Sequence, residues 1–291
     1  MRTEDFEALV NKGILLLDGA TGSNMRAAGM PVGVSTEAWI FEHPEPLIAL
    51  QRAYVEAGSD IVYAPTFSAN RLSLSMHGQE KRLRELNAGL VAISKEAVQG
   101  RALVAGDITT TGKPLEPVGT LSYHELLEIY QEQIATLAEA GADLLVAETM
   151  LTIDETACAV EAAKSVCDLP IMCSLTMEAD GHLLFGGSAT EAVETLQAVG
   201  ASAVGLNCSV GPDQLLSVVS AMKAVAEVPV IAKPNAGMPV MDEKGFAHYD
   251  MSPEYFAASM KKLVEAGAGI VGGCCGTNPE YIRRLAEAVK C

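Results

Sequence analysis

The sequence predicts a single-domain α/β protein of 291 residues folded as a (β/α)8 TIM barrel. Short apolar runs of strand length alternate with helical patterns eight times along the chain, and repeated β-α units of this kind form a parallel sheet surrounded by helices. The joints repeat as well. Ala57-Gly58, Ala140-Gly141, Val199-Gly200 and Ala266-Gly267 each stand between a helical pattern and an apolar run, where glycine is expected to end the helix in the left-handed conformation. No linker or composition shift within residues 1–291 marks a second domain.

The first units show how the elements are recognised. Ile14-Leu-Leu-Leu17 is an apolar run that ends at the loop Asp18-Gly-Ala-Thr-Gly22, which indicates a buried strand and a turn. A helical pattern begins near Pro44, and a new apolar run follows at Ile61-Val-Tyr63. In this way we expect strands at 14–18, 61–66, 102–107, 144–149, 171–177, 203–208, 230–235 and 270–274, and helices at 44–57, 80–98, 123–139, 153–166, 189–198, 213–226, 253–265 and 278–289.

Several helix starts carry a signature of their own. Ser122, Thr152, Ser188 and Thr277 each precede a glutamate by three positions, which is the capping-box pattern. Ser252 is followed by proline, which favours the first position of a helix. These helices are therefore predicted from their ends as well as from their periodicity.

Composition limits the possible functions. A chain of this length can bury roughly three quarters of its unfolded surface. Lys and Arg number 20 against 37 Asp and Glu, so the formal charge of −17 disfavours nucleic acids and anionic membranes as partners. The sequence has no membrane-length apolar run and an acidic N-terminus without a signal-peptide core, so we expect a cytoplasmic protein. Its seven cysteines do not resemble a disulfide framework.

Loop lengths predict which end of the barrel is functional. The long strand-to-helix loops are expected after strands 1, 3 and 7, at residues 19–43, 108–122 and 236–252, whereas the helix-to-strand joints are short. Active sites of such barrels lie at the carboxyl ends of the strands. The polar and thiol side chains expected there are Asp18, Asp107, Glu148, Cys208, Lys233, Asn235, Cys274 and Cys275.

The cysteines at two of these strand ends indicate a metal site. Cys208 ends Gly205-Leu-Asn-Cys208, and Cys274 and Cys275 follow Gly272-Gly273. Three cysteines meeting there would form a zinc site with three sulfur ligands and one open position, as in catalytic zinc centres, and thiolates select zinc over magnesium or calcium. Adjacent cysteines are not zinc-finger spacing, so the alternative is that they are small buried apolar residues.

The other metal-binding residue types carry less information. Cys158, Cys167 and Cys173 lie in a predicted helix and strand, where a small apolar residue suffices. The five histidines form no i,i+4 pair, so a histidine ligand or base is not expected. Glu148 could pair with Lys233, but a carboxylate at a buried strand end on the active face favours ligand binding.

The motifs together resemble the zinc-dependent homocysteine S-methyltransferases, which include the homocysteine-binding module of cobalamin-dependent methionine synthase and betaine-homocysteine methyltransferase. The resemblance covers essentially the whole chain, and its motifs occur in the order of the family. They are Asp18-Gly-Ala-Thr-Gly22, Ala69-Asn-Arg-Leu72, Glu148-Thr-Met150, Gly205-Leu-Asn-Cys208, Lys233-Pro-Asn-Ala-Gly237 and Gly272-Gly-Cys-Cys-Gly-Thr277.

The resemblance implies roles for these residues. Cys208, Cys274 and Cys275 would hold Zn²⁺, and Asn235 would fill the resting fourth position until substrate displaces it. The amino acid part of homocysteine would be held by Asp18, by the backbone of Gly19 and Ala20, and by Glu148. The implied reaction is methyl transfer to the homocysteine thiolate, giving methionine. A free thiol has a pKa near ~8.5 and reacts as the thiolate, and a helix beginning at Thr277 would stabilise the anionic sulfurs by ~0.3–1 kcal/mol.

The sequence also bears on the methyl donor. A quaternary ammonium needs an aromatic pocket, but Phe67 is followed by Ser68, where the betaine branch has tyrosine, and Trp39 lies beyond the matching tryptophan position. Asn235 and the segments 69–72 and 112–113 look more like the cobalamin-dependent branch, although Thr109-Thr110 replaces its common Gly-Pro. We therefore expect methylcobalamin or another methylcorrinoid on a separate protein that docks on the three long loops.

Two alternatives stay open from the sequence. The alternative to a methylcorrinoid is a small donor of the S-methylmethionine or betaine type. S-methylmethionine, a sulfonium, is favoured over betaine, because like a methylcorrinoid it presents an electrophilic methyl group and the aromatic residues of the betaine branch are missing. A function of a different class would be a non-catalytic zinc-thiolate protein or docking subunit. Such a protein would need neither an open metal position nor a carboxylate placed for an amine.

Overall fold

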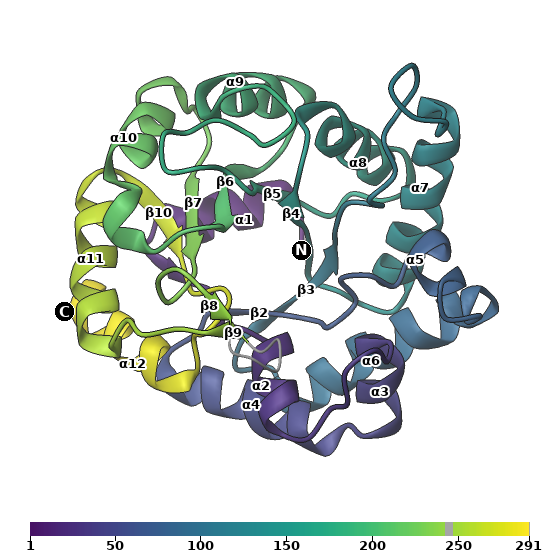
Figure 1. Ribbon diagram of the computed structural model, residues 1–291, viewed down its shortest axis with the longest axis horizontal. Coiled ribbons are helices and arrows are strands. Elements are labelled where there is room, and N and C mark those ends of the chain that lie inside the picture. The colour runs from purple at the N-terminus through teal and green to yellow at the C-terminus, as the bar shows by residue number, and fades with distance from the viewer. Residues whose placement is uncertain (242–246, 291) are drawn as a thin grey trace.

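The computed structural model describes residues 1–241 and 247–290, so residues 242–246 of the predicted seventh loop and Cys291 lie outside the described residues. Eight parallel strands form an inner ring, seen down its axis in Figure 1, and the (β/α)8 prediction is confirmed. The order of strands around the sheet is β1-β10-β7-β6-β5-β4-β3-β2. Their bounds are β1 (Leu15–Leu16), β2 (Ile61–Tyr63), β3 (Leu103–Ile108), β4 (Leu144–Met150), β5 (Ile171–Leu175), β6 (Ala203–Cys208), β7 (Val230–Pro234) and β10 (Ala268–Val271).

A helix follows each of these strands and packs outside the ring (Figure 1). Gly58, Gly141, Gly200 and Gly267 all have positive φ at the predicted helix-to-strand joints. No helix within the described residues has the length and apolarity to span a bilayer. The outer helices are α4 (Glu45–Ala57), α6 (Leu83–Val98), α7 (Tyr123–Glu139), α8 (Ile153–Val166), α9 (Ala189–Val199), α10 (Leu216–Val225), α11 (Pro253–Glu265) and α12 (Pro279–Val289).

Side chains help to close the ring between its first two strands. The Asp60 N–H donates to the Leu16 carbonyl at 2.7 Å, and the Asp60 carboxylate accepts the Leu16 N–H at 2.8 Å. One step further along, the Asp18 carboxylate accepts the Tyr63 N–H at 2.8 Å. Because β1 has only two residues, these carboxylates continue the seam that a longer ladder would otherwise make.

The interior of the ring is a separate apolar core, closed at one end by helix α1 (Thr3–Val10). Phe6 of α1 is completely buried and packs in the same cluster as Leu17 and Ile61. A larger core lies between the strands and the outer helices. Helix α1 was not predicted from the sequence, because its single buried residue, Phe6, leaves little periodic signal.

The strand-to-helix segments contain more regular structure than predicted. A third apolar cluster, which includes Met25, Ile40 and Leu74, packs the elements of the first two loops against α4 and α6. Packing between loops, rather than local periodicity, therefore stabilises these short helices. The additional elements are α2 (Gly22–Ala27), α3 (Thr36–Glu42), α5 (Arg71–Ser75), the 3-10 turns η1 (Glu80–Arg82) and η2 (Pro212–Gln214), and the antiparallel pair β8 (Val240–Met241) and β9 (Ala247–His248).

Three of the four predicted helix caps are confirmed, and so is Pro253 at the start of its helix. The side chains of Ser122, Thr152, Ser188 and Ser252 each accept a backbone N–H three residues later. The predicted cap at Thr277 is wrong: the last helix starts at Pro279, and Asn278 caps it.

The reason lies in the contacts of the threonine hydroxyl. Thr277 Oγ1 donates to the Cys274 carbonyl at 2.7 Å and accepts the Ala20 N–H at 3.1 Å. The hydroxyl therefore joins the first and last strand-to-helix loops and is not available to α12.

Candidate active site

The three predicted cysteines meet at the carboxyl end of the barrel. Cys208 is the last residue of β6, and Cys274 and Cys275 follow β10. Their Sγ atoms all lie within 4.8 Å of one another. Four tetrahedral ligands at the usual zinc–sulfur distance of ~2.3 Å place sulfurs about 3.8 Å apart, so the donor set and its spacing fit zinc with small side-chain adjustments.

The backbone around the cysteines is tightly held. Cys208 and Ser209 both have left-handed φ values, of 63° and 59°, a conformation that non-glycine residues adopt mainly at turns and functional sites. The Cys274 N–H donates to the Pro234 carbonyl at 2.7 Å, and the Cys275 carbonyl accepts the Ala236 N–H at 2.9 Å. The ends of β6, β7 and β10 are thereby brought together around the thiols.

Asn235 lies between the two residues that bind the cysteine backbone. It is 2% exposed, and its Nδ2 donates to the Ser209 carbonyl at 3.0 Å. Its Oδ1 is buried and accepts no hydrogen bond from the described residues. Buried amide oxygens normally have a partner, so this atom fits the predicted weak fourth ligand, a role that stays a prediction.

The thiols interact with one another in the metal-free protein. Hydrogen bonds with Cys208 and Cys274 lower the pKa of Cys275 to about 3. Hydrogen bonds with Cys274 and Cys275, together with burial, raise the pKa of Cys208. The three thiols titrate as one coupled group, and a metal that binds all three sulfurs as thiolates must displace the protons that they hold.

Beside the thiols lies a buried cluster of one lysine and three carboxyl groups. Lys233 Nζ is 3.7 Å from Asp18 Oδ1 and 3.7 Å from Glu148 Oε2, and it lies 4.8 Å from the centre of the Tyr63 ring. Asp107 is buried nearby, and all three carboxyl-bearing residues are at most 9% exposed. The predicted strand-end residues are therefore brought together, and Glu148 both pairs with Lys233 and faces the cavity.

The cluster lacks positive charge. Burial raises the pKa of Asp18 to about 7, although Lys233 opposes the shift. Burial and the neighbouring Glu148 likewise raise the pKa of Asp107. Burial alone would lower the pKa of Lys233, but Glu148 and Asp18 outweigh it and raise that pKa. One oxygen of each carboxyl group accepts no hydrogen bond from the described residues, so the cluster can accept a cationic group with several N–H donors.

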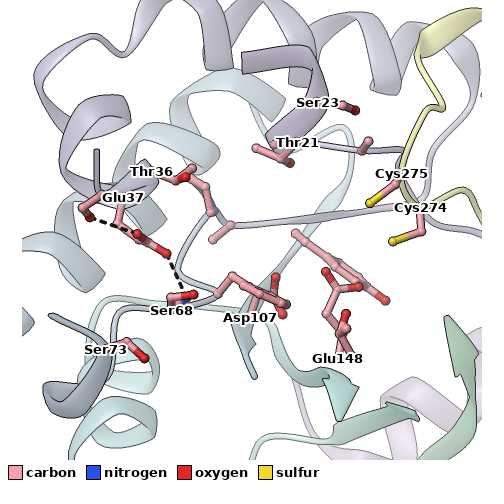
Figure 2. Close-up of a pocket in the computed structure, with 18 of the residues that line it drawn as sticks. Thr21, Ser23, Thr36, Glu37, Ser68, Ser73, Asp107, Glu148, Cys274 and Cys275 are labelled. Atoms are coloured by element: carbon pink, nitrogen blue, oxygen red, sulfur yellow. Dashed lines mark hydrogen bonds between the residues drawn. The ribbon is translucent and has the colours of Figure 1, made fainter. Parts of the chain in front are cut away.

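Thiols and carboxyl groups line one cavity of about 480 Å³. Figure 2 shows Cys274 and Cys275 on one side, Asp107 and Glu148 in the middle, and Glu37 with Ser68 on the opposite side. Glu37 is held by the Ser68 N–H at 2.8 Å and by Ser35 Oγ at 3.1 Å. The cavity therefore has an inner part at the sulfurs and an outer part enclosed by the first two loops.

The loop of Gly19 and Ala20 lines the cavity and is packed tightly. A Cβ on Gly19 would lie 2.6 Å from the Tyr54 hydroxyl and 2.8 Å from Thr277 Oγ1, so glycine is required there. The Ala20 N–H donates to Thr277 Oγ1, and the Ala20 carbonyl accepts the Tyr54 hydroxyl at 2.8 Å. The predicted substrate contact through the Ala20 backbone therefore has to compete with an existing hydrogen bond.

Two site residues were missed from the sequence. Asn207 is 1% exposed and donates from Nδ2 to Cys274 Sγ at 3.8 Å; its position beside Cys208 was the available signal. Tyr249 packs on Gly276, where a Cβ would lie 2.4 Å from its ring, and it contributes to the lowered pKa of Cys275. No sequence pattern points to Tyr249, because its contact depends on how the seventh loop folds back.

Known proteins resemble this chain over nearly its whole length. The family model for homocysteine S-methyltransferases matches residues 15–289. Methionine synthase of Mycobacterium tuberculosis is 28% identical over 303 residues, which cover 98% of this chain and 25% of that protein. Methionine synthase of Mycobacterium leprae is 28% identical over 311 residues, covering 99% and 25%. The chain thus spans about a quarter of the length of the curated relatives it matches.

Solved structures show the same fold. The homocysteine methyltransferase MmuM from Escherichia coli, in its metallated form, superposes with a TM-score of 0.81 at 23% identity, covering 96% of this chain and 98% of that one. Its oxidised form gives a TM-score of 0.80 at 22% identity, covering 94% and 95%. The barrel and the arrangement of its helices are therefore shared along nearly the whole length.

Proposed function

This chain is an enzyme of the homocysteine S-methyltransferase family, and we propose that it transfers a methyl group to the sulfur of homocysteine, giving methionine, with Zn²⁺ held by Cys208, Cys274 and Cys275. A single observation carries the proposal: three clustered thiols line the same cavity as three buried carboxyl groups, each with an oxygen that accepts no hydrogen bond from the described residues. The thiols suit a soft metal ion, and the carboxyl groups suit the ammonium of an amino acid.

The zinc assignment rests on the donor set. Three sulfurs within 4.8 Å of one another and the unpartnered Asn235 Oδ1 would supply three strong ligands and one neutral, weak ligand. When bound, zinc would keep the sulfur of homocysteine deprotonated at neutral pH. A free thiol has a pKa of ~8.5 and is mostly protonated at that pH. Asn235 is suited to leave because it carries no charge.

The chain's own residues would bind the amino acid part of the substrate. Asp18, Asp107 and Glu148 each present an oxygen that accepts no hydrogen bond from the described residues, and an ammonium group offers three donors. Two of these oxygens, on Asp18 and Glu148, lie 3.7 Å from Lys233 Nζ, and Lys233 partly offsets the rise that burial causes in the pKa values of these two carboxyl groups. The backbone of Gly19 and Ala20, on the adjacent wall, would face the substrate carboxylate.

The experiment that tests this function is a titration of homocysteine into the zinc-loaded protein. We expect stoichiometric binding with release of close to one proton at pH 7, because a thiol that is mostly protonated becomes a metal ligand. A storage or docking protein would bind zinc without binding homocysteine. Binding of zinc with neither homocysteine uptake nor proton release would therefore favour the non-catalytic function.

For the methyl donor, we propose methylcobalamin or another methylcorrinoid carried by a protein domain outside these 291 residues. Large apolar side chains are exposed mainly at one end of the barrel. Within the described residues, all of them except Val166 lie in strand-to-helix segments or at the first turns of the following helices. These segments share the end of the barrel where the cavity opens, and exposed apolar groups of this kind favour a protein partner. Examples from four loops are Val32, Met76, Phe185 and Met241.

A small cationic donor such as S-methylmethionine is the second candidate. The buried Glu37 carboxylate lines the outer part of the cavity, where it would attract a sulfonium. Betaine is disfavoured, because the Tyr63 ring is already covered by Lys233 at 4.8 Å and Trp39 stacks on His43 at 4.9 Å. Zinc-loaded enzyme given homocysteine with a methylcorrinoid protein, with methylcobalamin, or with S-methylmethionine decides between the donors. Methionine formed only with the sulfonium would overturn the corrinoid proposal.

The remaining assignments concern the extent of the domain, its location and its partners. We propose that residues 1–291 form one homocysteine-binding domain, in line with a family match over residues 15–289. A cytoplasmic location and the exclusion of nucleic acid as a partner stay predictions based on the sequence and its charge of −17.

A further inference from the structure

The buried side chain of Asn207 makes four hydrogen bonds. Its Oδ1 accepts the Thr149 N–H at 2.8 Å and the Ser174 hydroxyl at 2.9 Å. Its Nδ2 donates to Thr149 Oγ1 at 2.7 Å and to Cys274 Sγ at 3.8 Å. A backbone N–H can only donate, so the Thr149 contact fixes which end of the amide is the oxygen and directs the amide N–H₂ toward the sulfur.

The Thr149 contact controls the position of Glu148. Thr149 has a left-handed φ of 57°, which a β-branched residue adopts only when its surroundings hold it there. Asn207 supplies two of these holding contacts, at both the N–H and the hydroxyl. On the other side of the same peptide, the Glu148 carbonyl accepts the Thr109 hydroxyl at 2.8 Å. The backbone that carries the Glu148 carboxylate is therefore clamped from two directions.

The Cys274 contact acts on a sulfur of the proposed metal site. A hydrogen bond to an anionic sulfur removes part of its charge and restricts its rotation. Groups that hydrogen-bond to metal ligands in this way orient them and adjust their basicity. Asn207 thus reaches a thiol of the metal site and the backbone of a carboxylate in the amino acid site with one rigid amide.

We propose that Asn207 is a positioning residue that couples the amino acid site to the metal site, by fixing the Glu148–Thr149 peptide and by donating to Cys274 Sγ. The inference rests on the proposed function. It implies that the distance between the substrate ammonium and the substrate sulfur, when both are bound, is set in part by one side chain that touches neither.

The test compares three variants with the wild-type protein. Asn207→Asp keeps both acceptor contacts but cannot donate to Cys274 or to Thr149 Oγ1, and Asn207→Ala loses all four contacts. Ser174→Ala is the matched control, because it removes one bond to the same Oδ1 and leaves the contacts with Thr149 and Cys274. Each variant is loaded with cobalt(II) in place of zinc, and its near-ultraviolet thiolate-to-metal absorption is recorded; steady-state kinetics use the zinc-loaded forms.

We expect the absorption band to move to longer wavelength in both Asn207 variants, because the sulfur regains charge, and to stay in place in Ser174→Ala. The KM for homocysteine should rise about tenfold or more in Asn207→Ala and change less than threefold in Asn207→Asp and Ser174→Ala. Thermal melting of each loaded protein identifies any variant that fails to fold. If Asn207→Ala does not fold, the nearly isosteric Asn207→Asp still allows the absorption bands to be compared.

Two results would overturn the inference. An unchanged absorption band in both Asn207 variants at stoichiometric cobalt would contradict the proposed effect of Asn207 on Cys274. Equal KM values for homocysteine in Asn207→Ala and Ser174→Ala would contradict its proposed effect on Glu148. If the wild-type protein binds cobalt but not homocysteine, the proposed function is overturned, and so is the positioning of Glu148 for substrate. The comparison of absorption bands would still decide whether Asn207 donates to Cys274.

Discussion

Asp18 and Lys233 form a buried ion pair, with Asp18 Oδ1 3.7 Å from Lys233 Nζ, while the other oxygen of Asp18 accepts the Tyr63 N–H at 2.8 Å. One carboxylate therefore closes the seam between the first two strands and faces the candidate substrate site. The fold and the site share this residue, and its protonation affects both.

The first prediction concerns the stability of the metal-free protein as a function of pH. The pKa of Asp18 is raised from 3.8 to about 7 by burial, so the folded state holds this proton more tightly than the unfolded chain. That contribution to stability is complete below about pH 4 and is lost as the pH rises through 7. Relative to Asp18→Asn, the wild-type free energy of unfolding should fall by at most about 1.4 kcal/mol per pH unit between these limits.

Denaturant unfolding of both proteins at pH 5, 6, 7 and 8 measures this difference. A difference that is constant with pH would show that Asp18 is ionised throughout and that Lys233 compensates fully for its burial. Taking the difference removes the contribution of the other carboxyl groups, which titrate in both proteins.

The second prediction concerns the three thiols. Cys208→Ala, Cys274→Ala and Cys275→Ala should each lose tight zinc binding and methyl transfer, because two sulfurs with an amide oxygen no longer make a high-affinity thiolate site. Zinc content after dialysis against a chelator, and methionine formation, measure the two effects. Cys167→Ala is the control: its thiol bonds to the Ala163 carbonyl at the end of α8, and it should retain one zinc per chain. Full activity of Cys274→Ala at stoichiometric zinc would contradict the assignment.

The third prediction assigns Glu148 to the substrate ammonium. Glu148→Gln should raise the KM for homocysteine by about 10–100-fold, the loss expected for a charge-assisted hydrogen bond of ~1.5–3 kcal/mol, with zinc content unchanged. 4-Mercaptobutyrate, which lacks the ammonium, should bind the wild type and the variant equally well. Glu37→Gln is the control in the same cavity, because Glu37 lies on the opposite side from the thiols (Figure 2). If Glu148→Gln weakens the binding of homocysteine and of 4-mercaptobutyrate equally, Glu148 acts on the fold and not on the substrate ammonium.

The fourth prediction separates a protein-borne methyl donor from a small one. Phe185 is 65% exposed in the loop after β5, at the end of the barrel where the cavity opens. Phe185→Asp should lower kcat/KM for a methylcorrinoid protein about tenfold, the effect of removing one buried apolar contact from an interface, and leave the rate with free methylcobalamin unchanged. Val166→Asp, at the C-terminal end of α8, is the matched control on an exposed valine. Equal effects of the two substitutions would argue against docking at this end.

Local signals explain which elements were predictable. Helix α7, with Ser122 at its start, and helix α8, with Thr152, have the predicted bounds, because a side-chain cap is encoded within four residues. Helices α2 and α3 were not predicted, since Met25 and Ile40 obtain their burial from a cluster formed with α4, α5 and α6. Their stability depends on contacts that no short window of sequence contains.

The site was predictable to a similar extent and for related reasons. The cysteines and carboxylates could be predicted because parallel strands bring their carboxyl ends together. The engagement of the Ala20 N–H by Thr277 and the link from Asn207 to Cys274 could not, because they depend on the direction of single side chains, which the position of a residue at a strand end does not fix. Thr277 was misassigned for this reason: its sequence fits a cap, but its hydroxyl binds across the molecule.

The hydrogen bond between Ala20 and Thr277 also sets the order in which the molecule can mature during synthesis. The two residues are separated by 257 positions, and β1 pairs with β10, so a nascent chain that has not yet emerged past Val271 has no closed ring, and one that has not emerged past Cys275 lacks a complete set of thiols. Contacts of such long range form late in folding. Capture of a metal ion by all three cysteines would therefore report that translation and folding of the barrel are complete, and prematurely terminated chains would not retain it.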